Sequence, residues 1–213
     1  MKQTTRSVAI LAGGQATRFG GRDKSMLLVD GRTILDRQVG ELSSLTDDIL
    51  IVGTRAADVA PRGKPTGLVH PATDVARRIE DIVPGCGPLG GLHAALTEAR
   101  GDAVFLVACD MPYVTAPLVD YLFSLARHAD IVVPQTERGY HPLCAVYTRA
   151  CLALVAARLE ERRLRMRDLV SEMPARVVTA DDIDRFGDRS LLLANVNTPA
   201  EYAGLEALQG HKL

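Results

Sequence analysis

The sequence predicts an α/β fold, in which a mostly parallel central sheet carries helices on both faces. Two observations lead to the fold class and to the number of domains. Short apolar runs alternate with longer amphipathic segments along the chain, which is the pattern of repeated β–α units. The chain has 213 residues and contains no internal repeat or low-complexity linker, so we expect a single domain over residues 1–213.

The expected strands are short apolar runs bounded by polar or glycine-containing segments. They cover residues 7–11, 48–52, 67–70, 103–108, 130–133, 143–147 and 176–179. Between the second and third runs, residues 54–67 contain two prolines, two glycines and four charged residues. This composition predicts an exposed loop.

Three helices can be placed from the residues that begin them. Thr33 is expected to cap a helix whose apolar face runs from Ile34 to Leu45. Pro88 suits the first turn of a second helix, and Thr115 is a good N-cap for a third. In a fold of this class, ligands bind at the carboxyl ends of the strands. Functional motifs are therefore expected directly after the apolar runs.

Composition narrows the class of partner. The formal net charge of −1 and the pI near 6.5 show no bias toward nucleic acid or an anionic membrane, so neither is expected as a partner. No apolar run approaches the ~20 residues that span a bilayer. A small anion held by local charge is the more consistent substrate.

The four cysteines are Cys86, Cys109, Cys144 and Cys151. They form no C-x-x-C pair, and no histidine lies at zinc-ligand spacing from them, which argues against a structural metal site. Cys109 and Cys144 lie in apolar runs and are expected to be small buried hydrophobes. Free thiols without a secretory signal predict a cytoplasmic protein.

The most specific motif is the glycine-rich stretch that follows the first expected strand, Leu11-Ala12-Gly13-Gly14-Gln15-Ala16-Thr17-Arg18-Phe19-Gly20-Gly21-Arg22-Asp23-Lys24. Glycine-rich backbone can form an anion-binding concavity, and Arg18 and Lys24 add positive charge there. The stretch fits neither the P-loop register nor the dinucleotide fingerprint, because Lys24 is too far from Gly21 and the first two glycines are adjacent. It predicts a cradle for a nucleoside triphosphate; a glycine-rich surface turn is the alternative.

This stretch resembles the L-A-G-G-x-x-x-R-[MF]-G-G-x-D-K signature of the molybdenum cofactor guanylyltransferases. The resemblance implies a Rossmann-like nucleotidyltransferase fold. It also implies that Arg18 and Lys24 are catalytic. The residues implied to bind the nucleotide here are Leu11, Ala12, Gly13, Gly14 and Lys24.

A second motif, Cys109-Asp110-Met111-Pro112, ends the apolar run over residues 103–108. A carboxylate at the tip of a buried strand is well placed to hold Mg²⁺, which prefers one or two carboxylates together with substrate phosphates. The alternative is that Asp110 caps the following turn. The motif is similar to the family's C-D-x-P, which implies that Asp110 is a catalytic magnesium ligand and a nucleotide contact.

A third motif, Gly87-Pro88-Leu89-Gly90-Gly91, begins the second expected helix and resembles the family's G-P-L-[AG]-G segment. The resemblance implies nucleotide contacts from Pro88, Leu89 and the preceding Asp81, with Asp74 as the nearest competing carboxylate. It also favours guanine over cytosine, because the related cytidylyltransferases typically lack this segment and have L-A-A-G at the first motif. An ordinary glycine-rich helix entry is the alternative.

The second half of the chain carries weaker signals. His141 is typical of a hydrogen-bonded loop residue, although the family often has H-P here, which implies a contact with the acceptor substrate. Asn197, in Asn195-Val196-Asn197-Thr198-Pro199, resembles a late asparagine that assists the metal in related enzymes; a helix cap is the alternative.

Five arginines crowd residues 158–167 among acidic neighbours, which predicts a solvated surface of salt bridges. The alternative is that one or two of them bind the phosphate of a pterin substrate, since the guanidinium fork suits phosphate. The five are Arg158, Arg162, Arg163, Arg165 and Arg167.

Together the motifs predict transfer of GMP from GTP to molybdopterin or its molybdenum-loaded form, with Mg²⁺ as cofactor and pyrophosphate as product. Two alternatives stay open. One is a nucleotidyltransferase for another base or acceptor, such as a cytidylyltransferase or a sugar-phosphate enzyme. The other is a non-catalytic GTP-binding module for cofactor delivery. Transient contact with cofactor-biosynthesis proteins or molybdoenzymes is compatible with each.

Overall fold

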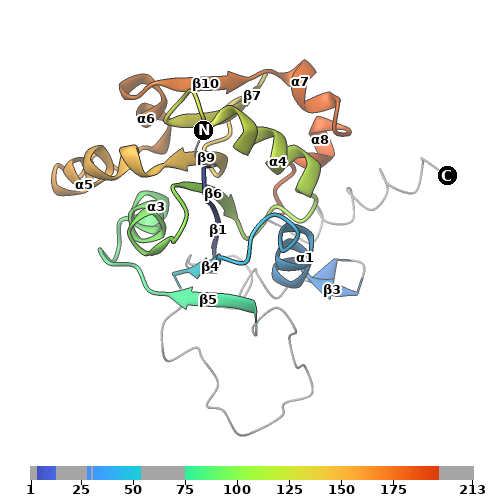
Figure 1. Cartoon of the computed structure of the whole chain (residues 1–213), viewed down its shortest axis with the longest axis horizontal. Coiled ribbons are helices and arrows are strands. Elements are labelled where there is room, and N and C mark those ends of the chain that lie inside the picture. The colour runs from blue at the N-terminus through green and yellow to red at the C-terminus, as the bar shows by residue number, and fades with distance from the viewer. Residues whose placement is uncertain (1–3, 13–27, 30, 54–74, 197–213) are drawn as a thin grey trace, which may run out of the picture.

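A mixed β-sheet runs through the computed structural model, which describes residues 4–12, 28–29, 31–53 and 75–196 (Figure 1). Its strands are β1 (Arg6–Leu11), β4 (Ile49–Val52), β5 (Ala76–Ile79), β6 (Ala103–Ala108), β7 (Ile131–Thr136), β8 (Gly139–Tyr140), β9 (Cys144–Thr148) and β10 (Ala175–Val178). The order is β10-β7-β9-β6-β1-β4-β5, with β8 paired to β7. On that path only β9 runs antiparallel to its neighbours. A separate short hairpin joins β2 (Leu28–Val29) to β3 (Arg32–Thr33).

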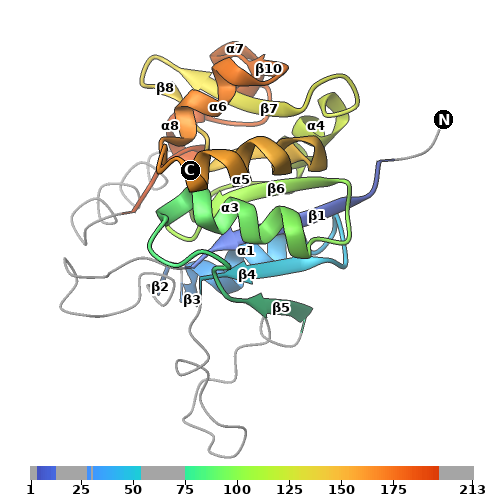
Figure 2. The ribbon, with the colours of Figure 1, turned by 90° about the vertical axis from the view of Figure 1, so that its left-hand side faces the viewer.

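Helices cover both faces of this sheet, as predicted (Figures 1 and 2). On one face lie α1 (Ile34–Leu42), α4 (Ala116–Leu125), α7 (Ala180–Asp184) and α8 (Arg189–Leu192). The other face carries α3 (Gly87–Glu98), α5 (Leu152–Glu160) and α6 (Met166–Glu172). Side chains of β6 alternate between the two cores: Phe105 and Val107 face the first group of helices, and Val104 and Leu106 the second.

The apolar runs located most of the described strands. The run over residues 103–108 matches β6 residue for residue, and β1, β4, β7, β9 and β10 differ from their predicted bounds by one to three residues at an end. The structure adds β5, which the sequence did not predict. This strand carries Arg77 and Arg78 and pairs with β4 alone, so no continuous apolar run marks it. The expected loop over residues 54–67 and the expected strand over residues 67–70 both lie outside the described residues.

Two of the predicted helix beginnings are confirmed in detail. The Thr33 hydroxyl accepts a hydrogen bond from the backbone N–H of Asp36 at 3.1 Å and so caps α1. Pro88 lies in the first turn of α3. Thr115 does occupy the N-cap position of α4, but its side chain makes no capping hydrogen bond. The prediction was right about where α4 begins and wrong about the side chain that would stabilise it.

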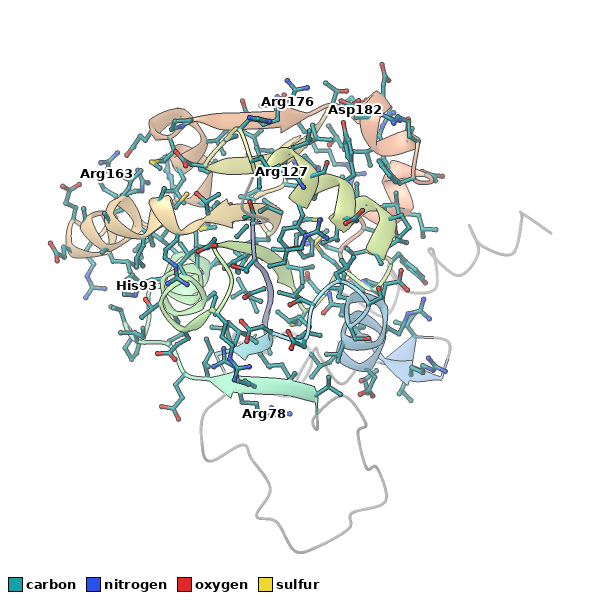
Figure 3. The ribbon with its side chains drawn as sticks, viewed as in Figure 1. Arg78, His93, Arg127, Arg163, Arg176 and Asp182 are labelled. Atoms are coloured by element: carbon teal, nitrogen blue, oxygen red, sulfur yellow. The ribbon has the colours of Figure 1, made fainter. Side chains whose placement is uncertain are left out.

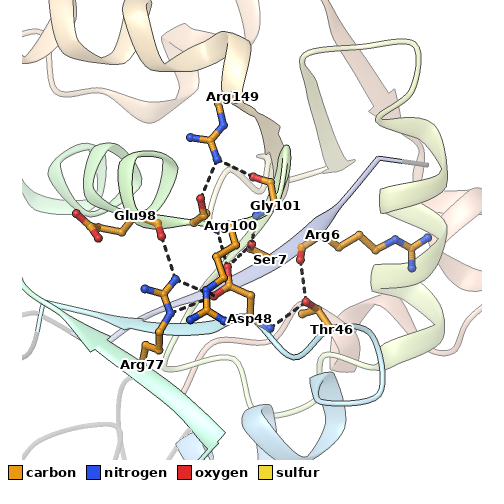
Figure 4. Close-up of polar contacts among 10 residues, drawn as sticks. Arg6, Ser7, Thr46, Asp48, Arg77, Glu98, Arg100, Gly101 and Arg149 are labelled. Carbon is orange, nitrogen blue, oxygen red and sulfur yellow. Dashed lines mark hydrogen bonds and ion pairs between the residues drawn. The ribbon is translucent and has the colours of Figure 1, made fainter. Parts of the chain in front are cut away.

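At the amino ends of the strands, a polar network ties the central sheet together (Figure 4). The Asp48 side chain is 3% exposed and accepts hydrogen bonds from Ser7 Oγ at 2.5 Å and from the backbone N–H of Arg100 at 2.8 Å. Arg77 donates to the same carboxylate at 2.7 Å. The backbone N–H of Gly101 donates to Ser7 Oγ at 2.8 Å. A Cβ on Gly101 would lie 2.5 Å from the backbone of Arg6, so only glycine fits there.

The strand order places a ligand crevice at the opposite edge. From β1 the chain builds β4 and β5 on one side, then returns to place β6 on the other side of β1. In open α/β sheets such a reversal leaves a crevice outside the carboxyl ends of the strands. The strand ends concerned here are those of β1 and β6, at Leu11 and Ala108, which are partners in the register, so this is where the rule predicts the crevice.

No helix among the described residues is long and apolar enough to cross a membrane. All four cysteines are described and carry free thiols. Cys144 is fully buried, as predicted, and burial raises the pKa of its thiol to about 12. Cys109 is only partly buried, because it belongs to the turn that follows β6 rather than to the strand itself.

Candidate active site

The end of β1 is fixed between its two neighbouring strands. The backbone N–H of Ala12 donates to Val52 O at 2.9 Å, and that of Cys109 donates to Leu11 O at 3.1 Å. Leu11 and Ala12 therefore lie at the crevice, as the first motif requires. The rest of that motif, including Gly13, Gly14, Arg18 and Lys24, lies outside the described residues.

Asp110 lies one residue further into the turn that follows β6, beside the end of β1. The backbone N–H of Met111 closes this turn on Ala108 O at 3.3 Å. The C-terminal part of the described chain also reaches the turn: Val196 N–H donates to Asp110 O at 2.8 Å. Asn195 Nδ2 donates to Asp110 Oδ1 at 3.4 Å. Two motifs that are 85 residues apart in sequence thus meet here.

The structure brings Asn195 to the carboxylate, whereas the sequence singled out Asn197, which lies outside the described residues. Both asparagines stand in the same short motif. Sequence spacing alone gave no reason to choose the first of them, because its relation to Asp110 depends on how the chain returns after α8.

The donors around Asp110 fit magnesium better than zinc. The described residues contain no group of three or more histidine, cysteine, aspartate or glutamate side chains that could hold a metal. One carboxylate with an amide beside it suits a hard cation that takes the rest of its oxygen ligands from phosphates and water. It does not suit a metal that needs a complete set of protein ligands.

The beginning of α3 approaches the same edge of the sheet. Gly85 and Gly87 have φ values of +77° and +57°, which favour glycine. A Cβ on Gly91 would lie 2.6 Å from the Leu11 side chain, so the N-terminal part of α3 packs directly on the end of β1. The Gly87–Gly91 motif therefore lies beside Leu11, the residue at which the first motif begins.

The side chains of the predicted nucleotide contacts in this segment point in different directions. Pro88 is exposed and lines a cleft, whereas Leu89 is fully buried in the core under α3. Any contact between Leu89 and a nucleotide has to come from its backbone. The residue type at this position is explained by packing.

Asp81 follows β5 and is partly buried. Among the described residues it has neither a hydrogen-bond donor nor a cation as partner. Burial raises the pKa of its carboxyl above the ordinary value. A partly buried carboxylate without a partner in the described chain is suited to accept hydrogen bonds from a ligand.

A cleft of about 530 Å³ opens beside the first turn of α3. One wall is Pro88, another is Pro142 and Leu143 before β9, and the third is the segment that joins α5 to α6. This third wall consists of Leu164 and Arg165 from that segment together with Met166, Arg167 and Asp168 from the first turn of α6. Two of the five clustered arginines therefore face a cleft.

The predicted solvated arginine surface is wrong for Arg158. This side chain is 1% exposed and donates to Glu172 at 2.6 Å, to Asp168 at 3.2 Å and to the backbone carbonyl of Arg165 at 3.1 Å. Arg163, by contrast, lies at the periphery with 49% of its side chain exposed and pairs with Glu161 and Glu172 (Figure 3). The buried Arg158 side chain thus connects α5 to α6 and to Arg165 behind the cleft wall. The charge pattern of the sequence did not reveal this role.

His141 is the hydrogen-bonded loop residue that the sequence favoured. Its backbone N–H donates to Pro134 O at 2.9 Å, and its ring Nε2 lies 2.9 Å from Thr136 Oγ1. Burial lowers the pKa of the imidazole, and the charges of Arg138 and Arg167 lower it further, so the ring is neutral near pH 7. It adjoins Pro142 in the cleft wall, which keeps the predicted acceptor contact open.

Known proteins share both the sequence pattern and this arrangement. The MobA-like NTP transferase domain matches residues 8–177 of the chain. The chain belongs to that family. A molybdenum cofactor guanylyltransferase from Desulfosudis oleivorans is 30% identical over 199 residues, 93% of each chain. A probable molybdenum cofactor guanylyltransferase from Methanosarcina acetivorans is 32% identical over 198 residues, 91% of this chain and 87% of the relative.

Solved structures agree with the fold. Molybdopterin-guanine dinucleotide biosynthesis protein A from Archaeoglobus fulgidus superposes with a TM-score of 0.77 at 19% identity and covers 96% of this chain and 99% of its own. The 2-C-methyl-D-erythritol 4-phosphate cytidylyltransferase from Thermus thermophilus has a TM-score of 0.64 at 18% identity, with 97% and 98% covered. The MobA-like protein described here is thus a nucleotidyltransferase enzyme, as the motifs indicated.

Proposed function

We propose that this MobA-like protein is a magnesium-dependent guanylyltransferase. It transfers the GMP part of GTP to the terminal phosphate of molybdopterin or its molybdenum-loaded form. An oxygen of the acceptor phosphate attacks the α-phosphorus of GTP, the bond between the α- and β-phosphates breaks, and pyrophosphate leaves. The product is a guanine dinucleotide form of the cofactor.

The observation that carries the proposal is the position of Asp110 beside the end of β1. The glycine-rich motif follows that strand end in the sequence, and we propose that the triphosphate binds between this motif and the carboxylate. The names of the relatives support the choice of nucleotide and acceptor.

The residue that would hold Mg²⁺ is Asp110, with Asn197 as a second candidate. When bound, the ion would neutralise charge on the phosphate oxygens of GTP. Asp110 supplies a negatively charged oxygen donor at a fixed place, because two backbone hydrogen bonds hold its turn. Cys109 N–H donates to Leu11 O at the end of β1, and Val196 N–H donates to Asp110 O. Asn195 donates to one carboxylate oxygen and orients it.

The glycine-rich motif would bind the triphosphate through the backbone N–H groups of Gly13 and Gly14. Arg18 and Lys24 would offset the negative charge that builds on the departing pyrophosphate. In phosphoryl transfer, positioning and charge stabilisation of this kind supply most of the rate enhancement.

The cleft between α3 and the α5–α6 segment is our candidate for the acceptor site. Arg165 and Arg167 line it, and no ion pair joins either side chain to another described residue. A guanidinium presents a fork of N–H donors that matches a phosphate. The acceptor phosphate is a monoester whose second pKa is about 6, so it is largely ionised at neutral pH and needs no general base.

Asp81 is our candidate for nucleoside recognition. Its carboxylate can accept hydrogen bonds from N–H groups of the base or from the ribose. A site built on such polar contacts can discriminate between bases by about 10⁴-fold or more, which shape alone does not achieve. This is the physical basis on which we expect guanine to be preferred over cytosine.

A pyrophosphate-release assay tests the proposal. The protein is incubated with molybdopterin and Mg²⁺ together with GTP, CTP, ATP or UTP. We expect pyrophosphate release with GTP that depends on both the acceptor and the metal. Release with CTP instead would identify a cytidylyltransferase, the second candidate.

Thermal shifts with the four nucleotides distinguish an enzyme from a non-catalytic GTP-binding module. A ligand at 100 times its Kd stabilises a protein by about 2.7 kcal/mol. Stabilisation by GTP without pyrophosphate release in the presence of acceptor would indicate the non-catalytic delivery module. A cytoplasmic location, a single domain over residues 1–213 and transient contact with molybdoenzymes or biosynthetic partners are parts of the same proposal.

A further inference from the structure

Gln38 lies on the side of α1 that faces the sheet, and only 2% of it is exposed. Its Nε2 group donates hydrogen bonds to Ala108 O at 2.8 Å and to Met111 O at 3.0 Å. These two carbonyls stand at the two ends of the turn that carries Asp110. One amide therefore closes the turn from the helix side.

The chemistry of the amide fixes its orientation. Nε2 carries two hydrogens, which is the number that two carbonyl acceptors require. The reversed amide would direct an oxygen at two other oxygens. The Oε1 atom is buried and accepts no hydrogen bond from the described residues, so both of the side chain's polar contacts serve the turn.

Two backbone hydrogen bonds hold this turn, from Cys109 N–H to Leu11 O and from Val196 N–H to Asp110 O. Gln38 adds to them where the turn's own closing bond is weak. The bond from Met111 N–H to Ala108 O is 3.3 Å long, near the upper limit for a backbone hydrogen bond. Without Gln38, the two buried carbonyls lose their side-chain donor and the turn can relax. The direction of the Asp110 side chain follows the backbone of that turn.

We propose that Gln38 is a positioning residue that holds the Asp110 carboxylate where it receives the metal of a metal–GTP complex. The inference rests on the proposed function, because the proposed function assigns the metal to Asp110. Partners behind a metal ligand usually change metal affinity or activity by about 10- to 100-fold when they are removed. We expect a similar effect for Gln38.

The test compares native protein with Gln38→Met, which keeps the side-chain length and removes both donors. Calorimetric titration measures the Kd for GTP twice, once with Mn²⁺ and once with EDTA. The ratio of the two values is the factor by which the metal tightens GTP binding. Asp110→Asn serves as the reference for loss of the metal ligand.

Thr33→Ala is the matched control, because it removes the N-cap of the same helix and touches no part of the Asp110 turn. It is expected to lower the Tm and to keep the tightening factor. Gln38→Met is expected to cut the factor by about tenfold or more and to leave the metal-free Kd unchanged. If Gln38→Met does not fold, Gln38→Asn is measured instead, since its shorter side chain cannot reach both carbonyls.

An unchanged factor in the glutamine variant overturns the inference, and so does a factor of one in the native protein. A weakened metal-free Kd also overturns it, because Gln38 would then support the GTP site as a whole. Pyrophosphate release is scored separately. Release by native protein with an unchanged factor in the variant rejects only the role of Gln38, whereas a reduced factor without any GMP transfer rejects only the proposed function.

Discussion

Asp48 and Asp110 stand at opposite edges of the same central strands, one before β4 and the other after β6. At the amino edge, the Asp48 carboxylate is buried and accepts hydrogen bonds from Ser7, Arg100 and Arg77 (Figure 4). At the carboxyl edge, Asp110 lies in a turn that is held through its backbone, while its side chain is partly exposed at the crevice.

Polar side chains at the two ends of the central strands have different roles. Where the chain's own donors fill the lone pairs of a carboxylate, that carboxylate joins β1, β4 and the end of α3 into one unit. Where polar groups such as Asp81, Arg165 and Arg167 lack partners among the described residues, they are available to a ligand. We therefore expect changes at the amino edge to affect stability and changes at the carboxyl edge to affect activity.

The largest effect is expected from Asp110→Asn. The amide has the same shape, and its oxygen can accept the bond from Asn195, so the fold should stay stable. Loss of the metal ligand should reduce kcat/KM by about 10²- to 10³-fold, which corresponds to about 3–4 kcal/mol. Pyrophosphate release and thermal unfolding measure the two effects.

Asp102→Asn is the matched control, because Asp102 precedes the same strand at its other end, where it accepts a hydrogen bond from Thr5 Oγ1 at 2.9 Å. Its kcat/KM should equal that of native protein. Native turnover in Asp110→Asn at saturating Mg²⁺ would contradict the assignment of the site.

The second-largest effect is expected on stability, from a change at the amino edge of the sheet. Asp48→Ala removes the acceptor shared by Ser7, Arg100 and Arg77 and should lower the free energy of unfolding by about 2–4 kcal/mol. The value stays below that for a fully buried ion pair because Arg77 is 36% exposed and can be hydrated. Chemical denaturation measures the loss, and kcat of the folded protein should not change.

The pH dependence of this effect follows from the pKa of Asp48. Burial alone would raise that pKa, but the hydrogen bonds from Ser7, Arg100 and Arg77 outweigh burial and lower it. The stabilisation is therefore complete above the unfolded pKa of about 4 and is lost as the pH falls toward the lowered value. Asp120→Asn, at an ion pair with Arg6 on the surface, should change stability by less than ~0.5 kcal/mol.

A smaller effect is expected from Arg167→Ala in the cleft. Loss of one charged hydrogen-bonding group costs about 1.5–3 kcal/mol, so the KM for the acceptor should rise about 10- to 100-fold. The KM for GTP and the Tm should stay unchanged. Arg176→Ala on β10, at the outer edge of the sheet, is the control (Figure 3). Equal effects of the two variants on the acceptor KM would remove the cleft as the acceptor site.

The sequence predicted what depends on apolar runs and local motifs. The run over residues 103–108 marked β6 and placed Asp110 at its end, and the alternation of runs and amphipathic segments gave the fold class. The roles of five residues remain predictions, because these residues lie outside the described part of the chain: Gly13, Gly14, Arg18, Lys24 and Asn197.

What the sequence could not show depends on contacts between distant segments. Arg158 is a charged residue in a charged stretch, and only the fold reveals that α6 encloses it. Gln38 is a polar residue in a helix, and its burial follows from the position of the Asp110 turn across the core. Strand β5 forms through pairing with β4, which a run containing two arginines does not predict.

The smallest predicted effect concerns Asp81, for which stability and binding should change in opposite directions. Burial raises the pKa of this carboxyl, so its ionised form is unfavourable in the folded protein, and stability falls as the pH rises above the unfolded pKa. Asp81→Asn should therefore raise the Tm slightly near pH 7. If the carboxylate accepts hydrogen bonds from GTP, the same change should weaken GTP binding by about tenfold.

The pH profile distinguishes this role from a structural one. As the pH falls from 7 through the raised pKa, native Asp81 becomes protonated and GTP binding should weaken toward that of the variant. Titration of GTP itself affects both proteins equally, so the ratio of their Kd values isolates the contribution of Asp81. A ratio that stays constant from pH 7 to the onset of acid unfolding would show that Asp81 does not bind the nucleotide as a carboxylate. The carboxyl edge would then hold a partly buried acid that serves neither stability nor recognition, and the contrast with Asp48 would fail at this residue.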